Sequence, residues 1–493
     1  MGEEVNSFWS KPWQPFCWAA AYLLIAGVIQ FFFVSVPYDA DTAFHVAVGR
    51  LIQEHGFLKA FPWTPFSWLA DHYADKELLL HLLFVPLAKV SWITAAKMVG
   101  TFLGAILLFG LYVILRAEKV QLAGVWAFLP LIASDVFLFR FSLVRPHLLS
   151  IPLAFLLLWA AARRRLILLA LISALYPWSY VAFWQLPILL LVAVETARIL
   201  SGERVQWKPI TATFAGIFLG WVLHPNSVNL LKFNWIVVDI LFKNAWQSKE
   251  GIELGIEFLP FTMTQWMEWL LVCVFMAMVG LVFAWRNRKK DYLSLTFALV
   301  TVFFGILTGL TARFAEYFIP FSVATFALAM RWVPWKALPA IVLCVVLPYT
   351  GFPLTETLHG LGIKINRIPP PLVSQLQQQI PKGSQIFTTE WGHTGTLMLA
   401  LPDRKFIVAL DPSLFLVKNP ALYQIWYDLP RNPKPGMAET IRKKFGARLV
   451  ISFWEVRYDE FYYRLSLEPG VRTLLASPLW MVYDLGPPQD KNN

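Results

Sequence analysis

The sequence carries little charge and almost no cysteine. Only 15% of its 493 residues are charged, 57% are hydrophobic, 16% are aromatic, and the mean hydropathy is +0.56. A soluble domain of this length would carry more charge, so the composition excludes an ordinary soluble enzyme. The three cysteines, Cys17, Cys273 and Cys344, fall inside apolar runs. They offer neither a disulfide framework nor the spacing of a cysteine metal site.

Several short signals are also missing. The sequence contains no Walker loop and no GxGxxG that opens a helix after a strand, so we expect no soluble nucleotide cofactor. The net charge of +11 is not gathered on a basic soluble face, which argues against a nucleic-acid partner. The first apolar run, 16–36, has neither a basic flank nor a small-residue cleavage site, so we expect a retained helix rather than a signal peptide.

Long apolar runs are abundant, and each is close to the roughly 20 residues that cross a bilayer. They predict a mostly α protein, a polytopic transmembrane bundle of about eleven helices. The second run is too long for one span, so we expect a short entry helix before a spanning helix that starts near Ile93. The expected spans lie near residues 16–36, 78–115, 122–138, 146–162, 166–180, 181–197, 209–224, 265–285, 291–310, 314–330 and 335–350.

Positive charge orients the bundle. If the amino terminus is cytoplasmic, every inner loop carries lysine or arginine, as the positive-inside rule requires. The inner residues are then Arg116, Lys119, Arg163, Arg164, Arg165, Arg198, Arg204, Lys208, Arg286, Arg288, Lys289, Lys290, Arg331 and Lys336. The loop 37–77 and the tail 351–493 would therefore face outward.

The tail differs in its sequence pattern from the predicted transmembrane domain, 1–350. It contains a predicted helix, PLVSQLQQQIP, and short apolar runs bounded by Gly, Pro and Asp: SQIFTTEW, KFIVAL, ARLVISFW and WMVYDLG. Runs of four to eight such residues are typical of buried strands, and they alternate with helical stretches such as MAETIRKKFG. We therefore predict a small α/β domain on the outer face.

Polar and ionisable residues gather on the predicted outer side. Such groups are costly at membrane depth, so their convergence predicts a functional cavity. The first loop supplies a pair of acids where one helix cap needs only one. The set comprises Asp39, Asp41, His45, Glu77, Arg145, His147, His224, Asn226, Lys232, Arg313 and Glu316.

Simpler interpretations exist for most of this set. Asp41 is placed to cap a helix whose apolar positions Ala47, Val48, Leu51 and Ile52 would lie along the membrane interface, with Trp63 and Trp68 as anchors. The segment Arg145-Pro146-His147 suits a helix start, and Arg313 with Glu316 has the spacing of an ion pair on one helix. His224 fits a capped helix end and Glu77 a solvated charge. In the tail, GHTG (392–395) and Asp411-Pro412 fit backbone turns.

An acidic pair after the first transmembrane helix, in a large outer loop with its own helix, resembles the GT-C superfamily of integral-membrane glycosyltransferases. A group of bacterial membrane proteins assigned to that superfamily is similar over most of the chain. The matching segments are DTAFHVAVGRLIQEHGFLKAFPWTPFSW, DKELLLHLLF, LVRPHLLS, HPNSVNLL and GSQIFTTEWGHTGTLMLALPDRKFIVALDPSLF. The sequence departs from that group at Asp75 and Leu78, where a His and a Trp are usual, and PWTPFS lacks the acid that usually precedes FS.

The resemblance implies transfer of a sugar from a polyprenyl-phosphate-linked donor, by inverting displacement, to a glycan, lipid or protein acceptor. It places the protein in the bacterial inner membrane, with the tail in the periplasm. Asp41 would then be the base, assisted by Asp39, while Arg145, His147, Lys232 and Arg313 would hold the phosphate. His224, Asn226 and Glu316 would complete the cavity.

Metal use and two rival functions stay open at this stage. If the enzyme uses a divalent metal, Mg²⁺ or Mn²⁺, the available ligands are Asp39, Asp41, Glu77 and His45. A transporter or flippase of a lipid-linked or anionic solute would also explain charge near the membrane, but it predicts helices broken at mid-membrane. A scaffold whose outer domain binds a partner would leave the acidic pair without a role.

Overall fold

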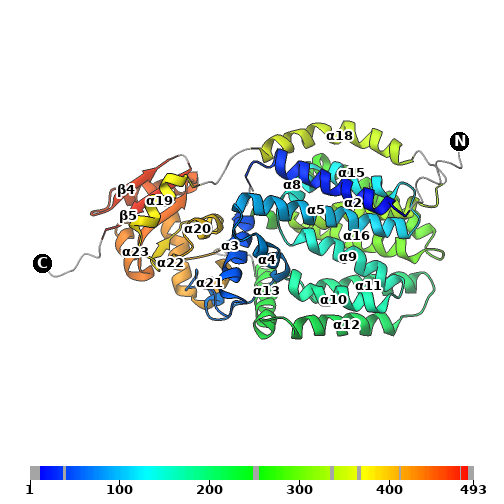
Figure 1. Cartoon of the computed structure of the whole chain (residues 1–493), viewed down its shortest axis with the longest axis horizontal. Helices are drawn as coiled ribbons and strands as arrows, with labels where there is room; N and C mark the ends of the chain where they lie inside the picture. Colours follow the sequence, from blue (N-terminus) through cyan, green and yellow to red (C-terminus); the bar gives the residue numbers. More distant parts are fainter. Residues whose placement is uncertain are drawn as a thin grey trace.

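The computed structural model describes residues 12–36, 40–247, 255–333, 338–362, 368–409, 412–477 and 479–486. A helical bundle fills the chain up to α18, and a small α/β domain follows it (Figure 1). The predicted fold class is therefore confirmed. The helix α18 (Leu338–Leu361) continues past residue 350, where the sequence predicted the domain boundary, and the outer domain begins with α19.

Hydropathy and length identify the membrane helices. Among the described residues, five helices are long and apolar enough to cross a bilayer: Gln14–Phe33, Trp92–Ala117, Met263–Arg286, Tyr292–Leu310 and Ala340–Leu361. A sixth span results if the bent pair Asp135–Ser142 and His147–Ala162 is counted as one. The protein is thus a multi-pass membrane protein. Shorter helices, among them α10, α11 and α12, run alongside these spans (Figure 1).

The helices of the bundle have the following bounds: α2 (Gln14–Val28, continued by a π-turn over Ile29–Phe33), α3 (Ala40–His55), α4 (Leu78–Phe84), α5 (Trp92–Ala117), α6 (Ala123–Phe128), α7 (Pro130–Ala133), α8 (Asp135–Ser142), α9 (His147–Ala162), α10 (Leu166–Ser179), α11 (Gln185–Leu200), α12 (Trp207–Val222), α13 (Ser227–Gln247), α14 (Met263–Gln265), α15 (Leu271–Arg286), α16 (Tyr292–Leu310) and α17 (Ala315–Met330). Short 3₁₀ turns lie at η4 (Ile256–Phe258) and η6 (Ala312–Phe314).

Two segments near the predicted spans position the site, one as the sequence predicted and one different from the prediction. The short entry helix before the second span is present as α4, and α5 starts at Trp92. The expected continuous span 122–138 is wrong, because the chain there forms α6, α7 and α8, with a proline at the start of α7. Proline lacks the backbone donor that a continuous helix requires. Between α8 and α9 the chain then bends by 112°.

The outer domain is built around a mixed five-stranded sheet with the strand order β2-β1-β3-β5-β4. The strand β1 runs parallel to β2 and β3, whereas β5 is antiparallel to β3 and β4. The elements are α19 (Pro370–Gln379), β1 (Gln385–Phe387), α20 (Thr394–Ala400), β2 (Lys405–Phe406), α21 (Pro412–Lys418), α22 (Pro420–Arg431), α23 (Met437–Phe445), β3 (Ala447–Phe453), α24 (Asp459–Ser466), β4 (Arg472–Ala476) and β5 (Trp480–Asp484).

The helix α3 joins the two halves of the molecule. Its apolar positions Ala47, Val48, Leu51 and Ile52 are buried in one cluster with Ile386 of β1, Ile451 of β3 and residues of α19 and α20. The expectation that this face lies on the membrane interface is therefore wrong: the outer domain covers it. Trp63 is buried as well, and its indole Nε1 donates a hydrogen bond to the carbonyl of Pro402 at 2.7 Å.

Candidate functional site

The first loop and the turn between α8 and α9 meet at the end of the bundle that faces the outer domain. Asp41 lies in the first turn of α3, inside the helix rather than at its cap. Its Oδ2 is 2.8 Å from Nη2 of Arg145. Arg145 precedes Pro146, and a residue before proline is disfavoured in the helical region, so the chain turns there before α9 begins. Asp39 lies outside the described residues.

Glu257, in η4, is the centre of the charged cluster. Its Oε2 accepts hydrogen bonds from Nη1 of Arg140 at 2.6 Å and from Nη1 of Arg145 at 3.2 Å. Its Oε1 accepts one from Nη1 of Arg313 at 2.7 Å. Burial alone would raise the pKa of Glu257, but the guanidinium groups of Arg313, Arg140 and Arg145 outweigh it and hold the pKa well below its usual range. Three guanidinium groups thus converge on one carboxylate.

A deeper pair supports this cluster. Glu316, at the start of α17, is 2% exposed and accepts a hydrogen bond from Nε of Arg140 at 3.0 Å. His147, at the start of α9, donates from Nε2 to the carbonyl of Arg140 at 2.9 Å. Its Nδ1 is 3.7 Å from Glu316. Glu316 and His147 therefore fix the position of Arg140, whose guanidinium faces Glu257.

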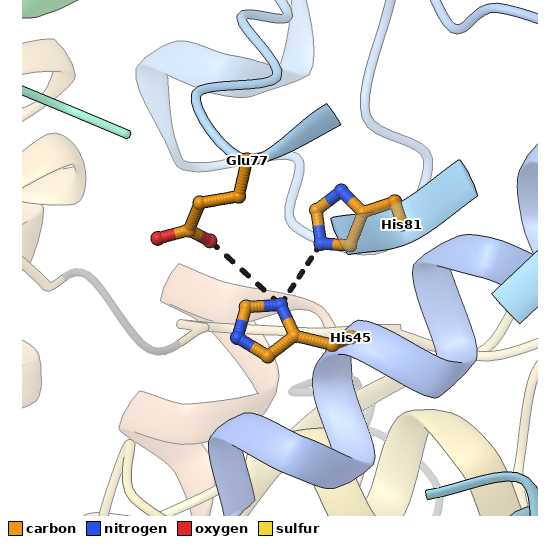
Figure 2. Close-up of side chains that lie close together, drawn as sticks. All are labelled: His45, Glu77 and His81. Atoms are coloured by element: carbon orange, nitrogen blue, oxygen red, sulfur yellow. Dashed lines mark hydrogen bonds and ion pairs between the residues drawn. The ribbon is translucent and has the colours of Figure 1, made fainter. Parts of the chain in front are cut away.

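A second polar group, formed by His45, Glu77 and His81 (Figure 2), involves α3 one helical turn after Asp41. Nδ1 of His45 is 2.9 Å from Nε2 of His81, on α4, and 3.7 Å from Oε2 of Glu77. Nδ1 of His81 lies 2.8 Å from the carboxylate of Asp75. Of the four metal ligands suggested by the sequence, His45 and Glu77 are close together. Asp41 is engaged by Arg145 instead.

The remaining predicted cavity residues have other surroundings. His224 and Asn226 are buried next to the Asp75 loop: the side chain of Asn226 accepts from Asp75 N at 3.5 Å and donates to Leu58 O at 2.9 Å. Lys232 is exposed on α13, where it lines an apolar groove of about 570 Å³ with Trp68, Trp184 and Trp235. No contact between Lys232 and the Glu257 cluster is found among the described residues.

The structure agrees with some of the simpler interpretations and disagrees with others. Arg313 pairs with Glu257 and Glu316 pairs with Arg140, so the ion pair expected between neighbours on one helix is replaced by two long-range pairs. His147 does begin α9, in agreement with the helix-start interpretation, while Arg145 is part of the charged cluster. In the tail, Gly392 lies in a turn whose amide donates to Glu390, and Asp411 lies outside the described residues.

Sequence reasoning missed Arg140, Glu257 and His81. Arg140 and His81 stand inside apolar runs, FLFRFSLV and LLLHLLF, and a single ionisable residue in such a run was the available signal. Glu257 lies in a stretch read only as a connection between two spans, and no local pattern marks it.

The fold of this chain is similar to that of solved structures, although no family model and no curated protein matches the sequence. The oligosaccharyltransferase of Archaeoglobus fulgidus in its apo form superposes with a TM-score of 0.67 at 15% identity, over 94% of this chain and 72% of its own. ArnT from Cupriavidus metallidurans bound to undecaprenyl phosphate gives 0.60 at 12% identity, over 97% and 100%. Arabinofuranosyltransferase AftD from Mycobacteria gives 0.55 at 16% identity, over 95% of this chain and 41% of that one.

These three proteins are GT-C glycosyltransferases, and the likeness extends over nearly all of this chain. The chain therefore has the GT-C fold, as its resemblance to that superfamily predicted.

Proposed function

We propose that this chain, which has the GT-C fold, is a membrane glycosyltransferase that moves a sugar from a polyprenyl-phosphate-linked donor to an acceptor on the outer face. The observation that carries the proposal is the meeting of Asp41 with Arg145, 2.8 Å apart, beside the Glu257 cluster. A displacement at the anomeric carbon with a lipid phosphate as leaving group needs a base for the nucleophile and positive charge for the phosphate. The base, Asp41, and the positive charge, Arg145, lie side by side here.

The convergence on Glu257 supports the phosphate-binding role. Guanidinium groups bind carboxylate and phosphate oxygens with the same forked geometry, so groups that surround one carboxylate can surround one phosphate. Arg145 and Arg313 are the two that also lie toward the edge of the cluster, with side chains 15% and 32% exposed. We expect the donor phosphate to take the place of the Glu257 carboxylate at these two residues, while Arg140 stays with Glu316.

The bond changes then follow from the positions of these groups. The acceptor nucleophile gives its proton to the Asp41 carboxylate and forms a bond to the anomeric carbon. The bond from that carbon to the phosphate oxygen breaks, and the phosphate leaves with the electron pair, neutralised by Arg145 and Arg313. Because Arg145 also contacts Asp41, a phosphate that draws Arg145 away makes the carboxylate available to the nucleophile.

The lipid donor and the location belong to the same proposal. One of the structural neighbours, ArnT, was solved with undecaprenyl phosphate bound, which supports a polyprenyl phosphate as the carrier. The positive-inside pattern supports a cytoplasmic amino terminus and a periplasmic outer domain in the bacterial inner membrane. The acceptor is a glycan, lipid or protein that reaches the site from the outer side.

The test uses the full chain reconstituted in liposomes with polyprenyl-phosphate donors that carry a radiolabelled sugar. Released polyprenyl phosphate and labelled product are measured together. We expect Asp41→Asn to lower the rate by about 10²- to 10⁴-fold, the usual contribution of a positioned base, with unchanged folding. The matched control is Asp71→Asn in the same loop, because Asp71 is exposed and pairs with Lys418 at 2.7 Å.

Two results would contradict the proposal. If the Asp41→Asn variant transferred sugar at the wild-type rate, Asp41 would not be the base. Movement of lipid-linked sugar across the bilayer without any glycosidic product would favour a transporter instead.

A further inference from the structure

The group formed by His45, Glu77 and His81 has no part in the sugar transfer proposed above. We infer that these three side chains form a binding site for a transition-metal dication of the Zn²⁺ class. His45 comes from α3, Glu77 from the residue before α4 and His81 from α4. Glu77 and His81 are four residues apart and so share one face of the chain at the start of α4. Figure 2 shows both facing His45.

The close packing of α3 on α4 brings the three residues together. Gly49, one turn after His45, has no side chain, and a Cβ at this position would lie 2.5 Å from Cβ of Phe84. Any other residue would push α4 away from α3. The result is a nearly closed site in which His45 and His81 are 3% and 2% exposed and the Glu77 side chain is 13% exposed.

Asp75 sets the ring nitrogen that faces the site. Both carboxylate oxygens of Asp75 lie 2.8 Å from Nδ1 of His81, so Nδ1 carries the proton and Nε2 presents its lone pair. A carboxylate that holds the far nitrogen of a histidine is the usual support of a metal ligand, because it fixes the tautomer and raises the basicity of the ligand atom. Asp75 is thus a positioning residue, and His81 presents Nε2 ready for an ion.

The distances match a small ion with little movement. In a four-coordinate zinc site with bonds of about 2.0–2.1 Å, neighbouring ligand atoms are about 3.3 Å apart. The two nitrogens here are 2.9 Å apart, Glu77 Oε2 is 3.7 Å from His45 Nδ1, and all three ligand atoms lie within 4.8 Å of one another. The ion takes the place of the proton between the rings, which moves to Nε2 of His45 or to water.

The ligand set selects the metal. Two imidazoles and one carboxylate suit Zn²⁺, Co²⁺ or Fe²⁺, whereas Mg²⁺ and Ca²⁺ prefer oxygen ligands. Three protein ligands also leave a coordination position open for water or another oxygen. Because His45 follows Asp41 by four residues on α3, the site lies one helical turn from the Asp41–Arg145 pair. The site shares His45 and Glu77 with the sequence prediction but uses His81 instead of Asp39 and Asp41, and it differs in its metal.

The experiment measures the metal itself. The full chain, with any affinity tag removed, is stripped with a chelator, loaded with Zn²⁺ in detergent micelles or nanodiscs, and dialysed. We expect about one bound ion per chain, and with Co²⁺ the visible absorption of a four- or five-coordinate site. His81→Ala and His45→Gln should lose this ion. Asp75→Asn should weaken the affinity by about 10- to 100-fold, and His72→Ala, an exposed histidine of the same loop, should bind like the wild type.

A measurement on the wild type alone keeps the inference testable if a variant fails to fold. X-ray absorption at the zinc edge should show two imidazoles and additional oxygen ligands. Equal metal binding by wild type, His81→Ala and His45→Gln would overturn the site, as would a zinc spectrum without imidazole scattering. If a variant loses the metal but still transfers sugar, the proposed function is unaffected. If the protein binds the metal but transfers no sugar, the metal site is unaffected.

Discussion

Arg140 shows how single residues hold the charged end of the bundle. Its guanidinium contacts Glu316 on one side and Glu257 on the other, so the buried positive charge is paired twice. Burial of an unpaired charge costs several kcal/mol, and each of the two acids would keep Arg140 paired if the other were removed. The same pairing fixes the direction in which Arg140 points, and with it the place where an anion is held.

His393, in the outer domain, is a residue whose burial has a measurable consequence. It precedes α20, and its ring stacks on Phe453 with centroids 4.2 Å apart. Its Nδ1 has no hydrogen-bond partner among the described residues. Burial, with a smaller effect of Arg457, lowers the pKa of His393 from 6.5 to about 4. The folded domain thus favours the neutral ring.

This lowered pKa predicts a loss of stability in acid. Below about pH 6.5 His393 is protonated in the unfolded chain, whereas in the folded domain it stays neutral down to about pH 4. Its contribution to the free energy of unfolding is therefore complete above pH 6.5 and is lost as the pH falls to 4. The loss from this group should reach about 3 kcal/mol. His393→Phe keeps a ring on Phe453 but cannot titrate. The thermal unfolding midpoint of the wild type should therefore fall relative to that of the variant between pH 7 and 4, and parallel curves would contradict the prediction.

At the scale of elements, the sequence predicted most helices and strands but not their contacts. The predicted helix PLVSQLQQQIP corresponds to α19, and the predicted apolar runs SQIFTTEW, KFIVAL, ARLVISFW and WMVYDLG correspond to β1, β2, β3 and β5, because hydrophobic periodicity is a local signal. The helix α13 was missed because Lys232 and Asp239 interrupt its apolar run, and β4 because its sequence, RTLLA, is short.

The candidate site was harder to predict for a physical reason. Asp41 and Arg145 were singled out, but their contact joins residues far apart in the sequence, and so do the contacts of Glu257 with Arg140 and Arg145. Such pairs depend on how α3, the α8–α9 bend and η4 pack together. No composition or spacing within one segment contains that information.

The pair α10 and α12 shows how closely elements can approach. Two glycines of α12, Gly216 and Gly220, face backbone carbonyls of α10: added Cβ atoms would lie 2.2 Å from Ala170 O and 2.1 Å from Ala174 O. Small residues four apart allow such close packing of membrane helices. The carbonyl of Gly220 also accepts a hydrogen bond from Trp178 Nε1 at 2.8 Å.

We therefore expect Gly220→Ala to separate α10 from α12 and to destabilise the protein by about 1–3 kcal/mol, as overpacking usually does. Gly309→Ala in α16 is the control, because nothing lies within 4 Å of a Cβ there, and alanine is the better helix former. Thermal unfolding in the same detergent should show a lower midpoint for Gly220→Ala alone. Equal midpoints for the two variants would contradict the close packing.

At the scale of the whole molecule, the basic loops lie at the end of the bundle opposite the outer domain (Figure 1). The helices α3 and α4 and the outer domain lie at one end of the bundle, while the turns from α9 to α10 and from α15 to α16 lie at the other end (Figure 1). The positive-inside rule therefore predicts that the outer domain lies outside the cytoplasm.

This orientation can be tested by labelling. In a variant whose three cysteines are replaced by serine, a single cysteine is introduced at His72 or at Lys290, both exposed. A maleimide that cannot cross membranes should label His72→Cys in cells whose outer membrane alone is permeable. It should label Lys290→Cys only after the inner membrane is opened, and the reverse pattern would refute the orientation.

The helix α3 has one further consequence. Its amino-terminal turn carries the carboxylate that faces Arg145, while its apolar side is an integral part of the core beneath the five-stranded sheet. Because α3 packs in that core, it must follow any tilt of the sheet. A change in the tilt of the sheet would therefore also move the Asp41 carboxylate relative to Arg145.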